Sequence, residues 1–383
     1  MLCSALAAAS VCLSMSGCGY MLVKKNTEPT ESLTQHISEY MAANPFYNPY
    51  NTLTDCDDEY IYCVQSQSKD TQAGIYRRPI SGGKWELIYV NDETPVEIIS
   101  EDGGSTASVV PGITSLTVYC DNLYFARFGH IYRMKNDGSD VTKTKYGARK
   151  DKRFPYALRV VEDVLYVGDS NEYNDGTYEK SMAFDLSADP DLSVIYEADI
   201  DNHVNTNVRP WSVLLPKDWM LSQEYSLFLT TPAGDNLSID TDYAPVLIDY
   251  QSMSALQVHS SAFFDEEGND RSYTAESIIK QVGIGDLNSR KSTLSIQFES
   301  DSPVLNPAPI RWRNASNGVL YGFLNQSLYA YDISAGAITD TKLPERLSYR
   351  PDIDVIGTLV FFRCTDLVVR CWNTTDMSVC VVG

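Results

Sequence analysis

The amino-acid sequence predicts an all-β protein, a β-propeller of seven blades with six or eight blades as alternatives, preceded by a short helical tether. Tyrosine, which favours strands, occurs 25 times in 383 residues. Short aromatic strand units recur along the chain, and the shorter intervals between them match one four-stranded blade. Two stacked β-sandwiches are the alternative architecture for such a pattern.

One unit, "LYFARFGHIYRMKNDGSD" (residues 123–140), shows the pattern clearly. Residues 123–125 predict a strand, 128–130 a break and 131–134 the return strand. Residues 136–138 predict a tight turn in which glycine supplies a positive φ. Apolar side chains on both faces of the first strand predict that it lies between two neighbouring sheets.

Similar units recur, and each carries an aromatic marker. The markers are Tyr62, Tyr124, Tyr166, Phe228, Tyr321 and Phe361, at intervals of 62, 42, 62, 93 and 40 residues. The copy at 225–252 is looser, and the longest interval is expected to hide a degenerate copy near 292–299. A period of about 40 to 45 residues over about 330 residues gives seven blades.

The N-terminus, "MLCSALAAASVCLSMSGCGY", predicts export. Its apolar run is too short to span a bilayer and matches a signal-peptide core. Ser16-Gly17-Cys18 resembles the lipobox of bacterial lipoproteins, although Met15 replaces the usual Leu and no Lys or Arg precedes the run, which is compatible with a start further upstream. The resemblance implies a lipoprotein signal peptide over 1–17 and acylation of Cys18 with diacylglycerol (palmitate among its chains).

That resemblance also implies a location at the cell membrane, lipid-anchored on its extracytoplasmic face. A buried N-terminal strand and an ordinary cleaved signal are the alternatives. Residues 18–50 are expected to be a tether and residues 51–383 the propeller. Within the tether, "PTESLTQHISEYMAANP" predicts a helix that packs on the domain as a strap or forms a stalk. The residues behind that prediction are Thr30 as N-cap, the stripe Leu33, Ile37, Tyr40 and Met41, and Pro45 at the end.

The net charge of −21 argues against nucleic acid as a partner, because phosphates need a cationic surface. It equally disfavours a basic patch on anionic lipid. Solubility explains the acidity as readily as a bound cation does. No cofactor is expected apart from a possible calcium ion.

Motifs for catalysis are absent from the sequence, including a zinc-protease His pair, a nucleophile elbow, a phosphate loop and a Cys-x-x-Cys pair. Four scattered histidines make a metal site or a catalytic triad improbable, so no metal or catalytic residue is assigned. Carboxylate pairs contributed by distant blades leave no local motif, so a glycan-active enzyme with its site at the central channel stays the alternative function.

Three long connections are expected to share one rim of the ring: 65–74, 168–180 and 230–244. Their mixture of carboxylates, amides and tyrosines suits either a glycan or calcium. A solvated loop is the alternative. The candidate ligand residues are Asp169, Asn171, Glu172, Tyr173, Asn174, Asp175, Tyr178, Asp235 and Tyr243.

Six cysteines beyond the leader cluster at the two ends of the predicted ring: Cys56, Cys63, Cys120, Cys364, Cys371 and Cys380. Export would allow disulfides, but six cysteines permit fifteen pairings, and free thiols are the alternative. The C-terminal strand "MSVCVVG" is expected to close the ring against the segment before the first blade, which would bring Cys56 near Cys380. Deleting Met377 to Gly383 is expected to lower the melting temperature sharply, whereas cutting the chain before about Pro45 is not.

The unit at 123–140 resembles the YWTD-type propeller repeat of the low-density lipoprotein receptor family, with Ala126-Arg127 in place of Thr-Asp. It looks closest to bacterial surface lipoproteins that carry a related domain of unassigned function. The resemblance implies the fold and not the receptor family's ligands. The expected function is therefore a membrane-anchored binding or scaffold protein that presents a propeller rim to a glycan, peptide or protein.

Overall fold

The computed structural model describes residues 30–99, 106–146, 153–171, 180–193, 213–215, 219–223, 227–230, 236–239, 246–252, 254–260, 277–283, 294–298, 310–341, 343, 346–349 and 351–383. The described strands form seven antiparallel sheets of blade size and one separate hairpin. Six of the seven sheets have four strands and one has three, and in each the strands neighbour one another in chain order.

The first half of the chain supplies three of these sheets. The first contains β1 (Thr54–Cys56), β2 (Tyr60–Gln65), β3 (Gly74–Pro79) and β4 (Glu86–Val90). The hairpin of β5 (Val96–Ile99) and β6 (Thr106–Val109) follows. The second sheet contains β7 (Ile113–Tyr119), β8 (Asn122–Arg127), β9 (His130–Lys135) and β10 (Thr142–Lys143), and the third β11 (Arg153–Val161), β12 (Val164–Asn171) and β13 (Lys180–Asp185).

The second half supplies the other four. They are β14 (Val213–Leu215), β15 (Trp219–Gln223), β16 (Leu227–Thr230) and β17 (Asn236–Ile239); then β18 (Val246–Asp249), β19 (Ser254–Ser260), β20 (Ser277–Gly283) and β21 (Leu294–Phe298). The last two are β22 (Arg311–Ser316), β23 (Val319–Leu324), β24 (Ser327–Asp332) and β25 (Ala337–Asp340); then β26 (Ile353–Ile356), β27 (Leu359–Arg363), β28 (Val369–Asn373) and β29 (Val379–Val381).

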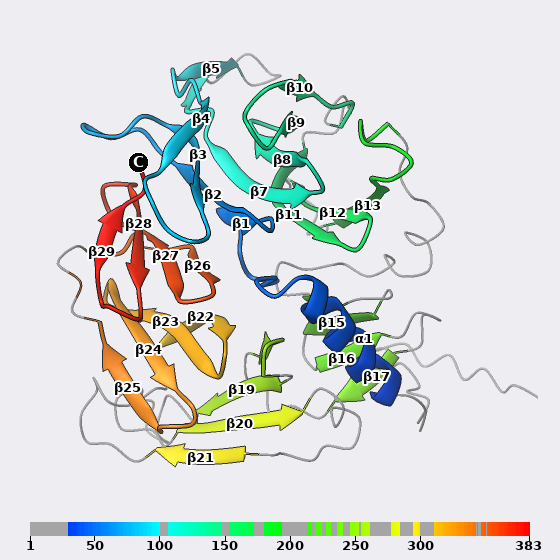
Figure 1. Ribbon diagram of the computed structural model, residues 1–383, viewed down its shortest axis with the longest axis vertical. Helices are drawn as coiled ribbons and strands as arrows, with labels where there is room; N and C mark the ends of the chain where they lie inside the picture. The colour runs from blue at the N-terminus through cyan, green and yellow to red at the C-terminus, as the bar shows by residue number, and fades with distance from the viewer. Residues whose placement is uncertain are drawn as a thin grey trace, which may run out of the picture.

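The sheets stand around a centre, with β1, β22 and β26 near the middle and β21, β25 and β29 at the periphery (Figure 1). The first strands of neighbouring sheets contact one another, from β22 to β26, β26 to β1, β1 to β7 and β7 to β11. This arrangement is a β-propeller, as the sequence predicts. The described residues supply seven blade-sized sheets, and the count of seven blades itself stays a prediction.

The quoted unit folds as expected. Strands β8 and β9 form a hairpin around Phe128 and Gly129, which both have positive φ. Leu123 and Phe125 join a hydrophobic core shared with the first sheet, whereas Tyr124 and Ala126 join one shared with the third. The strand is therefore buried on both faces, as a middle strand of a blade must be.

Five aromatic markers lie on the second strand of their sheets, but the sixth does not. Phe228 lies on β16, the third strand of its sheet. The looser copy at 225–252 therefore combines two strands of one blade with the first strand, β18, of the next. The copy expected near 292–299 is only β21, the outermost strand of the sheet that begins with β18.

The predicted ring closure is wrong. Strand β29 pairs with β28 in its own sheet, with Cys380 opposite Cys371, and not with the segment before the first blade. A hairpin to β28 closes a short loop, which costs far less entropy than pairing with a segment some 300 residues away. Since β29 is an outermost strand and β1 an innermost one, Cys56 and Cys380 belong to opposite edges of their sheets.

The predicted helix is present as α1 (Thr30–Ala43). Thr30 is its first residue rather than a residue outside it. On the expected stripe, Ile37 is fully buried, and the ring of Tyr40 packs edge-on against Tyr47 at 5.1 Å between centroids. This packing argues against the expectation that cutting residues before Pro45 leaves the melting temperature without a sharp fall.

Residues 44–53, called the strap below, run from α1 towards the inner strands (Figure 1). Asn48 donates to the Asn314 side chain on β22 at 2.8 Å, and Asn51 exchanges two hydrogen bonds with the backbone of Val355 on β26 at 2.8 and 2.9 Å. Arg159 of β11 donates to the Asn51 carbonyl, and the Ile248 N–H of β18 donates to the Tyr50 hydroxyl at 2.5 Å. The Leu116 N–H of β7 donates to the Thr52 carbonyl at 3.0 Å. The strap thus bonds to the first strands of five sheets.

Candidate functional site

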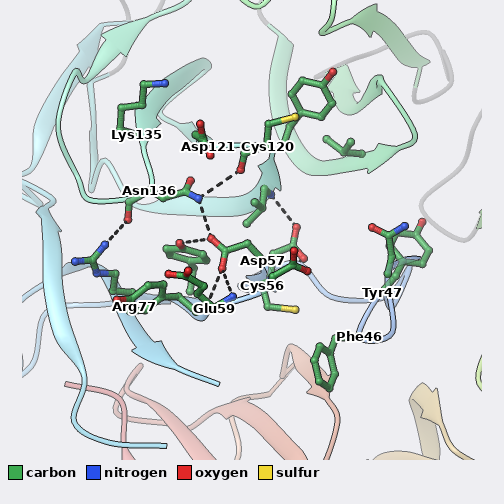
Figure 2. Close-up of a pocket in the computed structure, with 18 of the residues that line it drawn as sticks. Phe46, Tyr47, Cys56, Asp57, Glu59, Arg77, Cys120, Asp121, Lys135 and Asn136 are labelled. Carbon is green, nitrogen blue, oxygen red and sulfur yellow. Dashed lines mark hydrogen bonds between the residues drawn. The ribbon is translucent and has the colours of Figure 1, made fainter. Parts of the chain in front are cut away.

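A large cavity of about 1330 Å³ opens where the strap meets the turns between first and second strands. The turns β1–β2, β7–β8 and β11–β12 supply its floor, and the turn β9–β10 one side. Phe46 and Tyr47 stand on the side opposite Lys135 and Asn136 (Figure 2), and Tyr40 also lines the cavity. Two basic residues line it, Arg77 and Lys135. Nine acidic residues do so: Asp55, Asp57, Asp58, Glu59, Asp121, Asp137, Asp140, Glu162 and Asp163.

Asp57 organises the floor. One carboxylate oxygen accepts the backbone N–H groups of Glu59 and Tyr60 at 2.8 and 2.7 Å, which shapes the β1–β2 turn. The other oxygen accepts the Tyr62 hydroxyl at 2.6 Å and the Asn136 amide at 2.8 Å. Burial, and next the hydrogen bond to Asp57, raise the pKa of Tyr62, so its phenol stays protonated and donates.

Asn136 joins the first two sheets across the cavity. Its side-chain amide reaches Asp57 and the Cys120 carbonyl, and its own carbonyl accepts from the Arg77 guanidinium at 3.0 Å (Figure 2). Gly138, two residues on, has φ +88° and lies where an added Cβ would sit 2.1 Å from the Ile88 carbonyl oxygen. Glycine is therefore required for this turn to pack against the first sheet.

Asp55, at the bottom of the cavity, has a structural task. Its carboxylate accepts the Val118 N–H at 2.8 Å and the Thr117 hydroxyl at 2.9 Å, both from β7, and the Cys56 N–H at 2.9 Å. Burial raises the pKa of Asp55 against the lowering effect of these donors. Its oxygens hold two blades together and are already bonded to protein donors.

The carboxylates at the cavity mouth, unlike Asp55 and Asp57 on the floor, are exposed to solvent. Asp58, Glu59, Asp121 and Asp140 are exposed, and within the described residues none of them has a cationic partner. On the far side, Asp163 accepts the Tyr119 hydroxyl at 3.0 Å. Arg77 is engaged by Glu86 at 2.9 Å and by the ring of Tyr60 at 4.6 Å from its centroid. The cavity mouth is therefore strongly negative, with carboxylates available to an incoming cation.

The sequence-predicted rim falls elsewhere. Asp169 and Asn171 lie near the end of β12, where the chain leaves the second strand of its sheet. Glu172, Tyr173, Asn174, Asp175, Tyr178, Asp235 and Tyr243 lie outside the described residues. The cavity, by contrast, uses connections that leave the first and third strands, which emerge at the opposite face of a propeller.

The three connections expected on one rim are not equivalent. Those after β2 and β12 leave second strands, but the one after Thr230 leaves β16, a third strand. Because successive strands of a blade are antiparallel, a third strand ends at the opposite face from a second strand. The misassigned marker Phe228 caused this error, and the expected shared rim is wrong for that connection.

Asp354 on β26 is another buried carboxylate among the inner strands. It accepts the N–H groups of Leu53 and Thr54 at 2.7 and 2.8 Å, together with the N–H of Thr52 and the Thr54 hydroxyl, each at 3.0 Å. Burial, and next the charge of Asp352, raise its pKa to about 7. These bonds fasten the strap and β1 to β26, so this carboxylate performs a structural task at the channel.

Within the described residues, no group of three or more His, Cys, Asp or Glu side chains is arranged to hold a metal ion. The loop proposed for calcium lies largely beyond them. No helix in the described part of the chain is long and apolar enough to cross a membrane.

No protein-family model matches the chain, and no curated protein matches it. Among solved structures the chain is similar to one described as the WD40 beta propeller domain of Doa1. The two share 9% sequence identity over 85% of this chain and 93% of that chain, with a TM-score of 0.45.

Sequence reasoning missed the acidic cavity because it looked for long connections. The cavity is built from short turns of several sheets, brought together only by the ring. One local signal was present: the run Asp55-Cys-Asp-Asp-Glu59 at the first turn of the first blade. Asp121, Asp140 and Asp163 also line the cavity, but they do not belong to a run of acidic residues that would identify them in the sequence.

Proposed function

We propose that the protein is a binding scaffold whose acidic cavity receives a Lys- or Arg-bearing segment of a partner protein. The observation that carries the proposal is the cavity itself, with nine acidic residues against two basic ones over about 1330 Å³. Exposed carboxylates around a concave mouth focus a negative potential and attract cationic groups.

Tyrosine rings that line the cavity offer such a segment cation–π contacts in addition to charge attraction. Tyr60 already holds the Arg77 guanidinium over its ring, which is the geometry an incoming arginine would use on a neighbouring tyrosine. Tyr119 and Tyr40 line the same space. The cavity volume of about 1330 Å³ exceeds the roughly 300–1,000 Å³ of typical small-molecule pockets, which favours a larger ligand such as a peptide segment.

The test measures binding of the full-length protein to an array of Lys/Arg-bearing peptides, with Asp/Glu-bearing peptides of matched length and a glycan array beside it. We expect binding to basic peptides that weakens as salt rises. The double variant Asp58→Asn/Asp121→Asn should weaken it at least fivefold. The matched control Asp70→Asn/Glu97→Gln removes the same charge at exposed positions away from the cavity and should leave binding unchanged.

Equal weakening by both double variants would reduce the effect to net charge and contradict a specific site. Binding to glycans alone, unaffected by the Asp58/Asp121 variant, would instead favour the rim around Asp169 and Asn171 as the binding surface.

We further propose that lipid on Cys18 anchors the protein at the extracytoplasmic face of the cell membrane, as in the surface lipoproteins with YWTD-type propellers. The lipobox-like sequence Ser16-Gly17-Cys18 supports this proposal. Mass spectrometry of the mature N-terminus should find a diacylglyceryl-modified Cys18, and Cys18→Ala should release the protein from membranes. An unmodified Cys18 in the mature protein would contradict the anchor and leave the cavity proposal standing.

A further inference from the structure

Two cysteines face each other at the C-terminal edge of the ring. Cys371 on β28 is the register partner of Cys380 on β29. Backbone hydrogen bonds at Asn373–Ser378 (2.9 Å) and Val382–Val369 (3.2 Å) flank the pair at two-residue steps. The alternation of an antiparallel ladder makes 371/380 a hydrogen-bonded pair, whose Cα atoms lie about 5.5 Å apart. Disulfides bridge Cα distances of about 4.4 to 6.8 Å.

The two thiols sit in unlike surroundings. Cys371 is buried in the core shared with the first sheet, whereas Cys380 is exposed. Arg78 and Trp85 of the first sheet lie beside Cys380, with the guanidinium 5.0 Å from the indole centroid. Direct interaction with the Cys371 thiol lowers the pKa of Cys380 to about 6, and the charge of Arg78 contributes. That interaction and burial raise the pKa of Cys371.

We propose that Cys371 and Cys380 are a redox-active pair that a peroxide converts into a reversible disulfide. The exposed Cys380 thiolate attacks a peroxide oxygen, breaks the O–O bond and becomes a sulfenic acid, while the leaving hydroxide takes a proton to form water. The Cys371 sulfur then attacks the sulfenic sulfur, loses its proton and expels a second water. Two thiols are oxidised by two electrons and one hydrogen peroxide is reduced to two waters.

The disulfide would stabilise the short edge strand of the last sheet. Strand β29 has three residues and one hydrogen-bonded neighbour. Directly after it, the Val382 carbonyl accepts from the buried Gln65 amide of the first sheet at 2.6 Å. A disulfide would tie this edge strand to β28 and so hold that contact. Side chains stand further apart at a hydrogen-bonded pair, which strains the bridge and keeps it reducible.

The experiment uses the full-length protein with one equivalent of hydrogen peroxide, followed by blocking of free thiols, digestion with trypsin and mass spectrometry. Cleavage after Arg370 places both cysteines on one peptide, residues 371–383, because no further Lys or Arg follows. We expect this peptide to carry no blocking group, to be two hydrogen masses lighter than its unblocked reduced form, and to regain both thiols on reduction. The control Cys120→Ser removes another exposed thiol and should change nothing.

A second readout follows the chemistry at Cys380. The pH at which its alkylation rate reaches half its plateau should lie well below that of an ordinary thiol, and Cys371→Ala should raise that midpoint by at least one unit. A cross-link from this peptide to the peptide of Cys63, a buried thiol of the same hydrophobic core as Cys371, would overturn the proposal. So would a 371–383 peptide that stays reduced while other cysteines oxidise.

Discussion

Two contacts between neighbouring sheets, called seams below, are each held by a buried carboxylate. One seam joins sheets that follow each other in the chain, and the other joins the last sheet to the first. Between the first and second sheets, which the chain connects directly, Asp55 of β1 accepts an N–H and a hydroxyl from β7. Between the last and first sheets, at opposite ends of the chain, Asp354 of β26 accepts three N–H groups and a hydroxyl from the strap and β1. The seam without a covalent connection has more bonds on its carboxylate.

The comparison shows how this propeller closes although, among the described strands, none from one end of the chain pairs into the sheet at the other end. A buried carboxylate on the first strand of one blade accepts backbone donors from the first strand of the next, and the closing seam repeats that contact. Asp249 of β18 makes a related contact, since it accepts the N–H groups of Asn317 and Gly318 in the β22–β23 turn of the next sheet at 3.1 and 2.5 Å. Hydrogen bonds between these buried donors and acceptors offset the free-energy cost of removing them from water.

The largest effect is expected from removing the closing carboxylate. Asp354→Ala leaves three backbone N–H groups without their acceptor, two of them on the buried residues Leu53 and Thr54. We expect a loss of about 3–5 kcal/mol in the free energy of unfolding, from urea denaturation at pH 6. Asp55→Ala, which strands two donors of β7, should cost about 2–3 kcal/mol. A smaller loss for Asp354→Ala than for Asp55→Ala would contradict the comparison.

The pH dependence of the closing seam gives a second test. Asp354 ionises near pH 4 in the unfolded chain and at about 7 in the folded protein. Its contribution to stability is therefore fully present below pH 4 and is lost as the pH rises through 7. Relative to wild type, Asp354→Asn should gain on the order of 1 kcal/mol for each pH unit between 4 and 7, measured by urea denaturation.

Asp376 provides a control of opposite sign. The Ser378 hydroxyl and N–H lower the pKa of this exposed carboxylate, so its contribution is present at neutral pH and lost as the pH falls through its folded pKa. Asp376→Asn should accordingly show a small change in the other direction. Parallel pH curves for wild type and Asp354→Asn would refute the assignment of the titration to the closing seam.

The sequence predicted the features that depend on residues close together in the chain, within a single blade. Tyr62, Tyr124 and Tyr321 mark second strands because such strands are covered on both faces and need large apolar side chains. Phe228 has the same chemistry on a third strand, and the pattern of residues cannot separate the two. The acidic cavity and the seams join residues up to 317 positions apart, as Gln65 and Val382 are, and no local pattern carries such pairings.

The smallest loss of stability is expected at the outer edge of the closing seam. There the side-chain amide of Gln65, rather than a carboxylate, bonds to the backbone of the last sheet. Gln65 donates to the carbonyls of Val369 and Val382 at 3.0 and 2.6 Å and accepts the Val369 N–H at 2.8 Å. Gln65→Leu keeps most of the volume but strands these groups, so we expect a loss of about 1–3 kcal/mol. Gln72→Leu, at an exposed position of the same connection, should cost less than about 0.5 kcal/mol.

Hydrogen exchange locates that loss. Because the stranded groups belong to the edge of the last sheet, amides of Val369 and of β29 should exchange faster in Gln65→Leu, while those of β7 and β8 at the first seam should keep their wild-type rates. Uniform acceleration through both seams would mean that the substitution weakens the whole ring. Acceleration confined to the edge would mean that the closing seam opens from its outer edge while the Asp354 bonds hold its inner one.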